Sequence, residues 1–291
     1  MFSVYILTYN EEIDIAACIE SAMLSDDVIV VDSYSSDNTI EIASHYPVQI
    51  VQHKFETHGK QRTWMLKNVP TKYEWVYILE ADERMTPLLF AECLQAIQTT
   101  KYVGYYIAER VMFMGTWIRH STQYPRYQMR LFHKDKVWFA DYGHAEREVC
   151  QGLVSFLNES YPHFTCSKGL SRWIEKHNRY STDEAIETLQ QLENGTVNWQ
   201  DLLFGNSELA KRRALKNLSL RLPFRPLIRF IYMYFLLGGL LDGSAGLTWC
   251  LLQAFYEYLI VLKAKEFQTN ILPLVESLDL NKFSIPEKSL K

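Results

Sequence analysis

Four short apolar runs open the chain, and segments of helical length separate them. The runs cover residues 2–7, 28–32, 48–52 and 75–80, and they are rich in β-branched and aromatic residues. Such alternation is typical of a mostly parallel sheet covered by helices. Between the first two runs, residues 11–24 place their apolar side chains on one helical face. The sequence therefore predicts an α/β fold.

Polar clusters follow three of these runs, at residues 8–12, 32–39 and 80–83. Sheets of this kind bind ligands beyond the carboxyl ends of their strands. The chain has neither a GxGxxG motif after the first run nor a GxxxxGK[ST] motif, so phosphates must be held in another way. The acids Glu80, Asp82 and Glu83 would suit Mg²⁺ or Mn²⁺ that bridges a diphosphate.

Each cluster also has a structural interpretation without a ligand. Asn10 would be a helix N-cap, and Asp37 with Asn38 would form a turn before a capped helix over 39–46. The acids of 80–83 would be solvated loop residues. Against this, an apolar run leads directly into them, and burying carboxylates without a partner is costly.

Composition limits the classes of function. With 291 residues, 48% of them hydrophobic, the chain can bury a substantial core. The net charge of −4 argues against a general nucleic-acid binder. Five scattered cysteines without CxxC spacing predict neither disulfides nor a zinc site. The N-terminus lacks signal-peptide features, which predicts a cytoplasmic N-terminal half.

The motifs after the first, second and fourth runs carry a family resemblance. In order and spacing, residues 6–12, 30–39 and 78–83 resemble the inverting glycosyltransferases of family 2, which have the GT-A nucleotide-sugar-binding fold. Further segments resemble the branch that builds bacterial lipopolysaccharide cores and other surface polysaccharides: 126–132, 143–148 and 172–185. This resemblance implies an enzyme that transfers a hexose from a nucleotide sugar, with UDP favoured.

The resemblance also implies roles for particular residues. The nucleoside would be held by Thr8, Asn10, Glu12 and Asp32. The family's DxD motif falls on residues 80–82, where Asp82 would bind the metal. The resemblance places Glu80 facing the ribose or the metal's waters, although the family has aspartate here and glutamate is one methylene longer.

Basic residues in two places would contact phosphates. Lys60 and Arg62 would reach the donor phosphate, although an ordinary solvated helix start explains them equally well. Arg126 and Arg130 would hold the leaving diphosphate or an anionic acceptor, with an exposed strand arginine as the simpler alternative.

Inversion requires a base that takes the proton of the acceptor hydroxyl. The family places its base in the segment 138–149, but Ala145 here separates a histidine and a glutamate that many relatives have side by side. The base is therefore Glu146 or Glu148, with Asp141 third, and His144 would orient the acid or the loop.

From Ser171 onward the sequence is typical of helices. One helix is expected over 171–195, followed by basic residues and two apolar stretches, 230–241 and 245–262. Because Asp242 and Glu257 interrupt the apolar residues, the stretches favour helices in the membrane interface over spanning helices. The alternative is a soluble hairpin packed on the catalytic domain or in a dimer, which leaves a homo-oligomer open.

Together these features predict a GT-A domain over 1–165 and a helical, membrane-associating region over 166–291. The expected partners are a nucleotide sugar, a lipid-linked or lipopolysaccharide-type glycan acceptor and anionic lipids, with no nucleic acid. The expected place is the cytoplasmic face of the inner membrane. Two other classes are a nucleotidyltransferase, which the missing glycine-rich phosphate loop disfavours, and a non-catalytic carbohydrate-binding protein.

Overall fold

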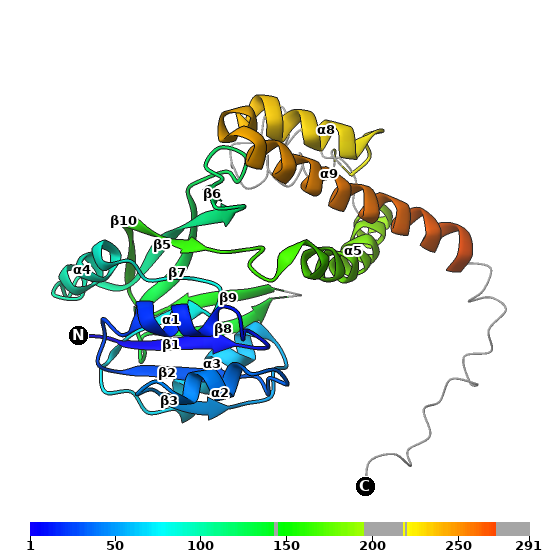
Figure 1. Cartoon of the computed structure of the whole chain (residues 1–291). Coiled ribbons are helices and arrows are strands. Elements are labelled where there is room, and N and C mark those ends of the chain that lie inside the picture. Colours follow the sequence, from blue (N-terminus) through cyan, green and yellow to red (C-terminus); the bar gives the residue numbers. More distant parts are fainter. Residues whose placement is uncertain (143–144, 195–217, 219, 272–291) are drawn as a thin grey trace, which may run out of the picture. The chain divides into compact units, whose positions relative to one another are not determined.

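The computed structural model describes residues 1–142, 145–194, 218 and 220–271. The chain divides into two compact units, Met1–Gly169 and Leu170–Lys291. The elements of the first unit are coloured from blue to green in Figure 1 and succeed one another as follows: β1 (Ser3–Thr8), α1 (Ile15–Ala22), β2 (Val28–Asp32), α2 (Thr39–Ser44), β3 (Gln49–Gln52), α3 (His58–Asn68), β4 (Trp75–Glu80), α4 (Pro87–Ala96), β5 (Tyr102–Phe113), β6 (Thr116–Trp117), β7 (Arg126–His133), β8 (Val137–Tyr142), β9 (Ala145–Cys150) and β10 (Leu153–His163).

A mixed, mostly parallel sheet forms the centre of this unit. Its strand order is β10-β5-β7-β4-β1-β2-β3, with β6 paired to β5. Strands β3, β2, β1 and β4 run parallel, β7 is antiparallel to both of its neighbours, and β10 is parallel to β5. The predicted α/β fold with a mostly parallel sheet is confirmed.

The central strands β1, β2 and β4 are buried on both faces, which explains why they are almost entirely apolar. Successive side chains of β1 point to opposite faces, so Val4 and Ile6 pack with helix α1, whereas Tyr5 packs with Met65 of α3. On α1 the buried residues are Ile15, Cys18, Ile19 and Ala22, as the periodicity predicted.

The carboxyl ends of the central strands meet at one edge of the sheet. In the parallel register Thr8 at the end of β1 pairs with Asp32 at the end of β2, and Leu7 pairs with Glu80 at the end of β4. The polar clusters that follow these strands therefore come together, as expected for a parallel sheet.

A separate hairpin of β8 and β9 carries the segment predicted to hold the base. Its antiparallel register pairs Asp141 with Glu146 and Phe139 with Glu148. The hydroxyl of Thr63 on α3 donates to the carbonyl of Phe139 at 2.7 Å, and the guanidinium of Arg62 lies 5.2 Å from the Phe139 ring centre. Helix α3 thus fixes the hairpin to the sheet.

The second unit is helical wherever it is described with regular structure. Its elements are α5 (Gly169–Asn194), α8 (Arg225–Ile231), the π-helical turn η1 (Tyr232–Leu236), the 3₁₀ turn η2 (Gly239–Asp242), α9 (Gly243–Glu266) and the π-helical turn η3 (Phe267–Ile271). The helix expected over 171–195 is α5, although its predicted cap Gly195 lies outside the described residues.

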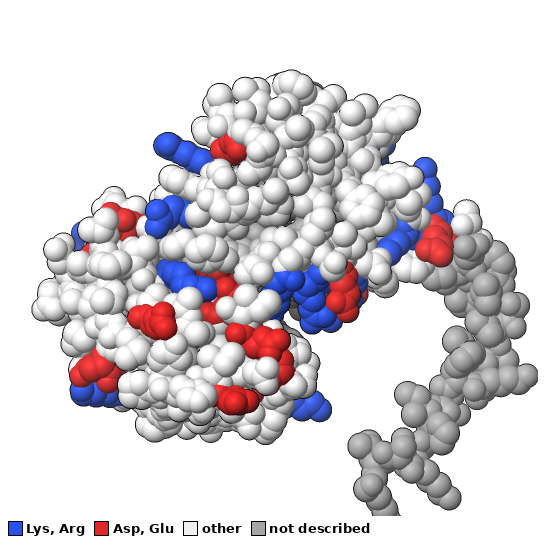
Figure 2. Space-filling model, viewed as in Figure 1, with Lys and Arg blue, Asp and Glu red and all other residues white. Residues whose placement is uncertain are grey.

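The last helical run is apolar. Gly239–Thr269, 31 residues, is long and apolar enough to cross a membrane by length and composition, a test that a core helix of a soluble protein also passes. Figure 2 shows few charged side chains over α8 and α9. Four of the basic residues that precede this run in the sequence lie outside the described residues: Lys211, Arg212, Arg213 and Lys216.

Candidate active site

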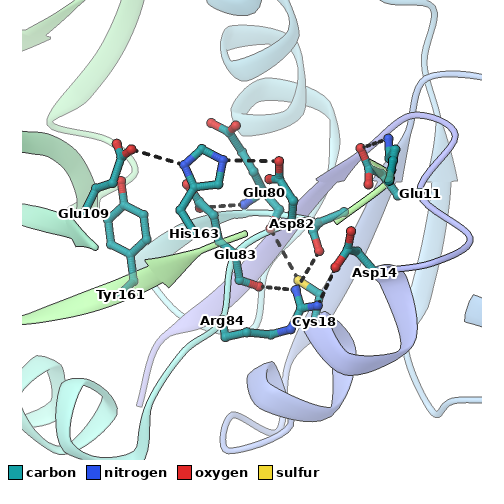
Figure 3. Close-up of polar contacts among 12 residues, drawn as sticks. Glu11, Asp14, Cys18, Glu80, Asp82, Glu83, Arg84, Glu109, Tyr161 and His163 are labelled. Atoms are coloured by element: carbon teal, nitrogen blue, oxygen red, sulfur yellow. Dashed lines mark hydrogen bonds and ion pairs between the residues drawn. The ribbon is translucent and has the colours of Figure 1, made fainter. Parts of the chain in front are cut away.

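The candidate site lies where the acidic turn, residues 80–83, leaves β4 and meets the end of β10. The amide of Phe164 donates to the carbonyl of Asp82 at 2.8 Å, and the amide of Arg84 donates to the carbonyl of Pro162 at 3.0 Å. These bonds bring His163 beside the acidic turn although 81 residues separate it from Asp82 in the sequence. Figure 3 shows the resulting group of acids, histidine and arginine.

Two arginines neutralise Glu80. Its Oε1 accepts hydrogen bonds from Arg62 and from both terminal nitrogens of Arg130, each at 3.2 Å. Burial opposes ionisation of Glu80, but the positive charges of Arg130 and Arg62 outweigh it and lower the pKa of this carboxyl to about 2. Glu80 is therefore ionised and tied to the protein's own cations.

Glu83 also pairs with Arg130. The two side chains form an ion pair of 2.5 Å and are 0% and 1% exposed. The second carboxylate oxygen of Glu83 accepts from the amide of Glu80 at 2.9 Å, which closes the turn on itself. The Arg130 guanidinium also lies 5.1 Å from the Tyr161 ring centre. Arg130 is enclosed and engaged, so this arrangement does not offer it to a diphosphate.

Asp82 differs from both glutamates because its charged partner is a histidine. The Asp82 carboxylate lies 3.2 Å from Nε2 of His163, while Nδ1 of His163 lies 3.2 Å from Glu109. Burial would lower the pKa of His163, but its contacts with Asp82 and Glu109 raise it well above the usual value of an imidazole. Arg126 of β7 binds Glu109 through Nε and Nη2.

A second acidic group borders the turn on the side of α1. Arg84 binds Asp14, the N-cap residue of α1, at 2.7 Å. Glu11 pairs with Lys168, and burial raises its pKa to about 7 although Lys168 partly offsets this. Within the described part of the chain, Oε2 of Glu11 and Oδ2 of Asp14 are buried without a hydrogen-bond partner. The N-cap of α1 is Asp14, so the alternative that assigned this role to Asn10 is wrong.

The four residues predicted to hold the nucleoside lie together at the ends of β1 and β2. Asp32 is fully buried and accepts from the amide of Ser35 and from Gln52, both at 2.9 Å. Thr8 is buried beside it with no hydrogen-bond partner for its hydroxyl in the described residues.

Asn10 and Glu12 join the loop after β1 to the loop after β2. Oδ1 of Asn10 accepts from the amide of Ser36 at 2.7 Å, and Glu12 accepts from the side chain of Asn38 at 2.9 Å. Asn10 itself has a positive φ of 53°, a conformation that asparagine tolerates better than most residues. Hydrogen bonds therefore join the two loops to each other.

Lys60 forms a 2.7 Å ion pair with Glu56, four residues earlier in the sequence, and both side chains are exposed. Arg126 is the most exposed of the four predicted phosphate contacts, with 61% of its side chain accessible.

Of the four candidates for the base, only Glu148 has a described side chain. It accepts a hydrogen bond from the hydroxyl of Tyr106 on β5. Asp141 and Glu146 are placed by their paired backbones in β8 and β9, and His144 lies outside the described residues.

Among the described residues, no three His, Cys, Asp or Glu side chains are grouped so that they could hold a metal ion by themselves. Asp82 and His163 are nevertheless a carboxylate and an imidazole that face each other at 3.2 Å. A carboxylate and a neutral imidazole are side chains of types that bind divalent cations, through oxygen and nitrogen respectively.

Sequence reasoning missed His163, Glu109 and Glu11. His163 and Glu109 are isolated polar residues in their segments: the pairing of β10 with β5 brings them together, and the backbone bonds between the end of β10 and the acidic turn bring His163 to Asp82. Glu11 was passed over for its neighbour Glu12, although Glu11 is the more buried of the two acids.

The chain belongs to glycosyl transferase family 2, because the model of that family matches residues 3–151. It is therefore a glycosyltransferase, and the predicted family and enzyme class are confirmed. A curated relative, the lipopolysaccharide core biosynthesis glycosyltransferase LpsC of Rhizobium meliloti, is 26% identical over 275 residues and covers 90% of each chain. An uncharacterised glycosyltransferase of Rickettsia typhi, RT0209, is 24% identical over 201 residues, 65% of this chain and 68% of its own.

Solved structures resemble the chain more distantly. TarS residues 1–349 of S. aureus in complex with UDP-GlcNAc is 14% identical and covers 92% of this chain and 91% of its own, with a TM-score of 0.42. Glucosyl-3-phosphoglycerate synthase of Mycobacterium tuberculosis in complex with Mn²⁺, UDP and glucosyl-3-phosphoglycerate is 22% identical over 38% of this chain and 44% of its own, with a TM-score of 0.34.

Proposed function

We propose that this glycosyltransferase transfers a hexose from a UDP-sugar to a hydroxyl of a lipid-linked or lipopolysaccharide-type glycan, with inversion at the anomeric carbon. The observation that carries the proposal is the division of charge in the acidic turn. Glu80 and Glu83 are neutralised by Arg62 and Arg130, whereas Asp82 faces His163. Membership of the family gives the reaction class. Asp82 is the carboxylate that would bind the cation that neutralises the donor's diphosphate.

Asp82 and His163 would hold a Mg²⁺ or Mn²⁺ ion in this proposal. When bound, the cation would neutralise charge on the leaving diphosphate as a Lewis acid. The chain's own residues keep the two ligands in place: Glu109 holds the far nitrogen of His163, and the amide of Phe164 holds the backbone of Asp82. Such support of a ligating histidine by a carboxylate fixes its ring orientation.

Thr8, Asn10, Glu12 and Asp32 would hold the nucleoside. The hydrogen bonds of Asn10 and Glu12 support the proposal because they already fix the loop after β1 to the loop after β2, so little ordering is needed on binding. Asp32 would act through the backbone of Ser35, to which it is bonded. Arg126 is the exposed cation on the Glu109 side of the site that would contact an anionic acceptor or the diphosphate.

Glu146 would take the proton of the acceptor hydroxyl. Of its two competitors, Glu148 already accepts a hydrogen bond from the hydroxyl of Tyr106. Asp141 lies directly opposite Glu146 in the hairpin register. In this proposal residues 1–165 are the catalytic domain and residues 166–291 bring it to a lipid-linked acceptor at the cytoplasmic face of the membrane. LpsC is named for lipopolysaccharide core biosynthesis, which supports this class of acceptor.

Donor binding with and without Mn²⁺ tests the proposal. Calorimetry over a panel of UDP, GDP and dTDP sugars should give binding to a UDP-hexose that Mn²⁺ strengthens in the natural protein. The strengthening should be lost in Asp82→Asn and retained in Asp135→Asn, a matched change in an exposed turn between β7 and β8. Binding that is equal in Asp82→Asn and in the natural protein, with and without Mn²⁺, would contradict the role of Asp82.

A further inference from the structure

Helix α9 carries an exposed apolar stripe along its length. The residues are spaced four, four, three and four positions apart, so they lie on one side of the helix. All are exposed: Leu247, Leu251, Phe255, Tyr258 and Leu262. An exposed apolar stripe of this kind is unusual on a soluble monomer and indicates an interaction surface.

The opposite side of α9 is attached to α5. Ile260 and Ala264 pack against Ala185, the hydroxyl of Tyr256 donates to Glu184 at 2.8 Å, and Lys263 donates to the side chain of Thr182 at 2.8 Å. By helical geometry these α9 residues lie on the side away from the stripe. The stripe therefore points away from α5.

Helix α8 and the turns after it extend this apolar surface beside α9 (Figure 1). No residue of α8 is buried. The exposed apolar residues here are Phe224, Leu227, Ile228, Ile231, Phe235, Leu236, Leu240 and Leu241. Arg225 of α8 and Glu257 of α9 form an ion pair in which the side chains are only 14% and 19% exposed. These two charges neutralise each other, and Figure 2 shows few charged side chains over α8 and α9 on the face in view.

The sequence that leads into α8 carries charge of the sign that attracts anionic lipids. Residues 211–229 contain seven Lys or Arg residues and no Asp or Glu. Exposed apolar side chains next to a basic segment fit a bilayer with anionic headgroups. We propose that α8, η1, η2 and α9 lie in the plane of the membrane within one leaflet, with the stripe towards the acyl chains. This proposal rests on the membrane location given above and adds the contact surface and its depth.

The attachment to α5 argues against a helix that crosses the membrane. Helix α9 has 24 residues, and at about 1.5 Å each it is long enough to span a core of about 30 Å. From Tyr256 onward, however, one side of α9 contacts α5, a helix that carries many charged residues: Arg172, Glu175, Lys176, Arg179, Asp183, Glu184 and Glu187. Crossing would draw these charges towards hydrocarbon, at a high cost in free energy.

The part of α9 that precedes its contact with α5 is too short to cross a bilayer. Residues 243–255 measure about 20 Å along the helix axis, less than the core of about 30 Å. If α9 lies in the plane of the membrane, one side of it contacts α5 and the other side contacts lipid.

Co-sedimentation with vesicles of phosphatidylglycerol and phosphatidylcholine tests the surface. Leu251→Glu with Phe255→Glu should weaken vesicle binding by about tenfold or more, because two buried apolar contacts are lost and charge is added. The matched control is Leu88→Glu with Leu153→Glu, two exposed leucines of the first unit, and it should bind as the natural protein does. An equal loss of vesicle binding in both double variants, or a loss in neither, would overturn the proposed lipid contact surface.

Donor binding and oligomeric state, measured on the same samples without lipid, separate the other outcomes. If the natural protein binds UDP-hexose but no vesicles, the membrane surface is wrong and the glycosyl transfer stands. If the Leu251→Glu and Phe255→Glu variant turns a dimer into a monomer and leaves vesicle binding intact, the stripe is an interface between two copies.

Depth along the helix tests one-leaflet insertion. A fluorophore is attached at Leu247→Cys, Phe255→Cys or Leu262→Cys, in a background with Cys150→Ser and Cys166→Ser that removes the partly exposed thiols outside α9. Lipids with a nitroxide near the headgroup should quench all three positions similarly and more strongly than lipids with a nitroxide at the bilayer centre. A depth that changes steadily from residue 247 to residue 262 would show that α9 crosses the membrane and would overturn the proposal.

Discussion

At the scale of single residues, the acidic turn shows how a chain separates structural acids from a ligand-binding acid. Arg130 and Arg62 hold Glu80, and Arg130 also holds Glu83, so two of the three carboxylates have permanent cations. The charged partner of Asp82 within the described part of the chain is His163, whose charge depends on a proton. The same short segment thus contains a fixed ion-pair network and one carboxylate, Asp82, that in the proposal would hold a metal together with His163.

The buried pair of Arg130 and Glu83 should dominate the stability of this region. Arg130→Met removes the cation and leaves a carboxylate with 0% exposure unpaired, so it should lower the free energy of unfolding by about 3–5 kcal/mol. Urea denaturation measures this. Lys72→Met, which breaks the exposed ion pair with Asp26, should change it little. Similar losses in the two variants would show that Arg130 is not an essential partner.

The base is also tested by single residues. Glu146→Gln should bind the nucleotide sugar normally and lose sugar transfer by roughly a hundredfold or more, since an amide cannot take the acceptor's proton. Turnover and donor binding are measured side by side for Glu146→Gln, Glu148→Gln and Asp141→Asn. Full turnover in Glu146→Gln with loss in Glu148→Gln would move the base by two residues, and full turnover in all three would place it outside the β8–β9 hairpin.

Residue types and order were enough to locate much of the candidate site, but not the contacts within it. The acids of the turn and the loops after β1 and β2 follow strands whose ends must meet in a parallel sheet. His163 lies on β10 and Glu109 lies on β5, and no local sequence pattern predicts that these two strands pair. The engagement of Arg130 with Glu83 likewise depends on the antiparallel entry of β7 beside β4.

At the scale of elements, the β8–β9 hairpin is held to α3 by the hydroxyl of Thr63. Thr63→Val keeps the shape of the side chain and removes this bond, which should cost about 1 kcal/mol of stability. Because the hairpin carries the proposed base, a small displacement should also lower turnover by roughly tenfold, with donor binding retained.

Thr248→Val is the control for this change, because it removes a comparable hydroxyl bond within α9. Steady-state kinetics should separate the two variants. Unchanged turnover in Thr63→Val would mean that the hairpin position is not set by α3.

The strands could be predicted from the sequence where both of their faces are buried. β1, β2 and β4 are continuous apolar runs because helices or a hairpin cover both faces, and the buried side of α1 has helical spacing. The ends of the C-terminal helices could not be predicted as well. The apolar stretch expected to start at residue 230 begins inside α8 and continues through a π-helical turn and a 3₁₀ turn. Local hydrophobicity does not distinguish these helix types.

At the scale of the whole molecule, the basic segment before α8 should bring the enzyme to anionic membranes. Changing Arg212, Arg213 and Lys216 together to Gln should weaken co-sedimentation with anionic vesicles, by on the order of 1 kcal/mol for each side chain. These residues lie outside the described part of the chain, so the prediction comes from their sequence. A triple change of exposed lysines in the first unit, Lys54, Lys67 and Lys101, serves as the control. Equal vesicle binding by the natural protein and the first variant would count against an electrostatic contribution of this segment.

The rate of sugar transfer by Asp82→Asn tests the central claim most directly. An amide at this position keeps the size of the side chain but loses the charge that would hold a diphosphate-bridging cation beside His163. With a UDP-hexose donor and a lipid-linked glycan acceptor, transfer should be abolished in Asp82→Asn and in the natural protein with excess chelator, and restored by Mn²⁺ only in the natural protein. Near-normal turnover by Asp82→Asn, or activity that excess chelator leaves undiminished, would contradict the account.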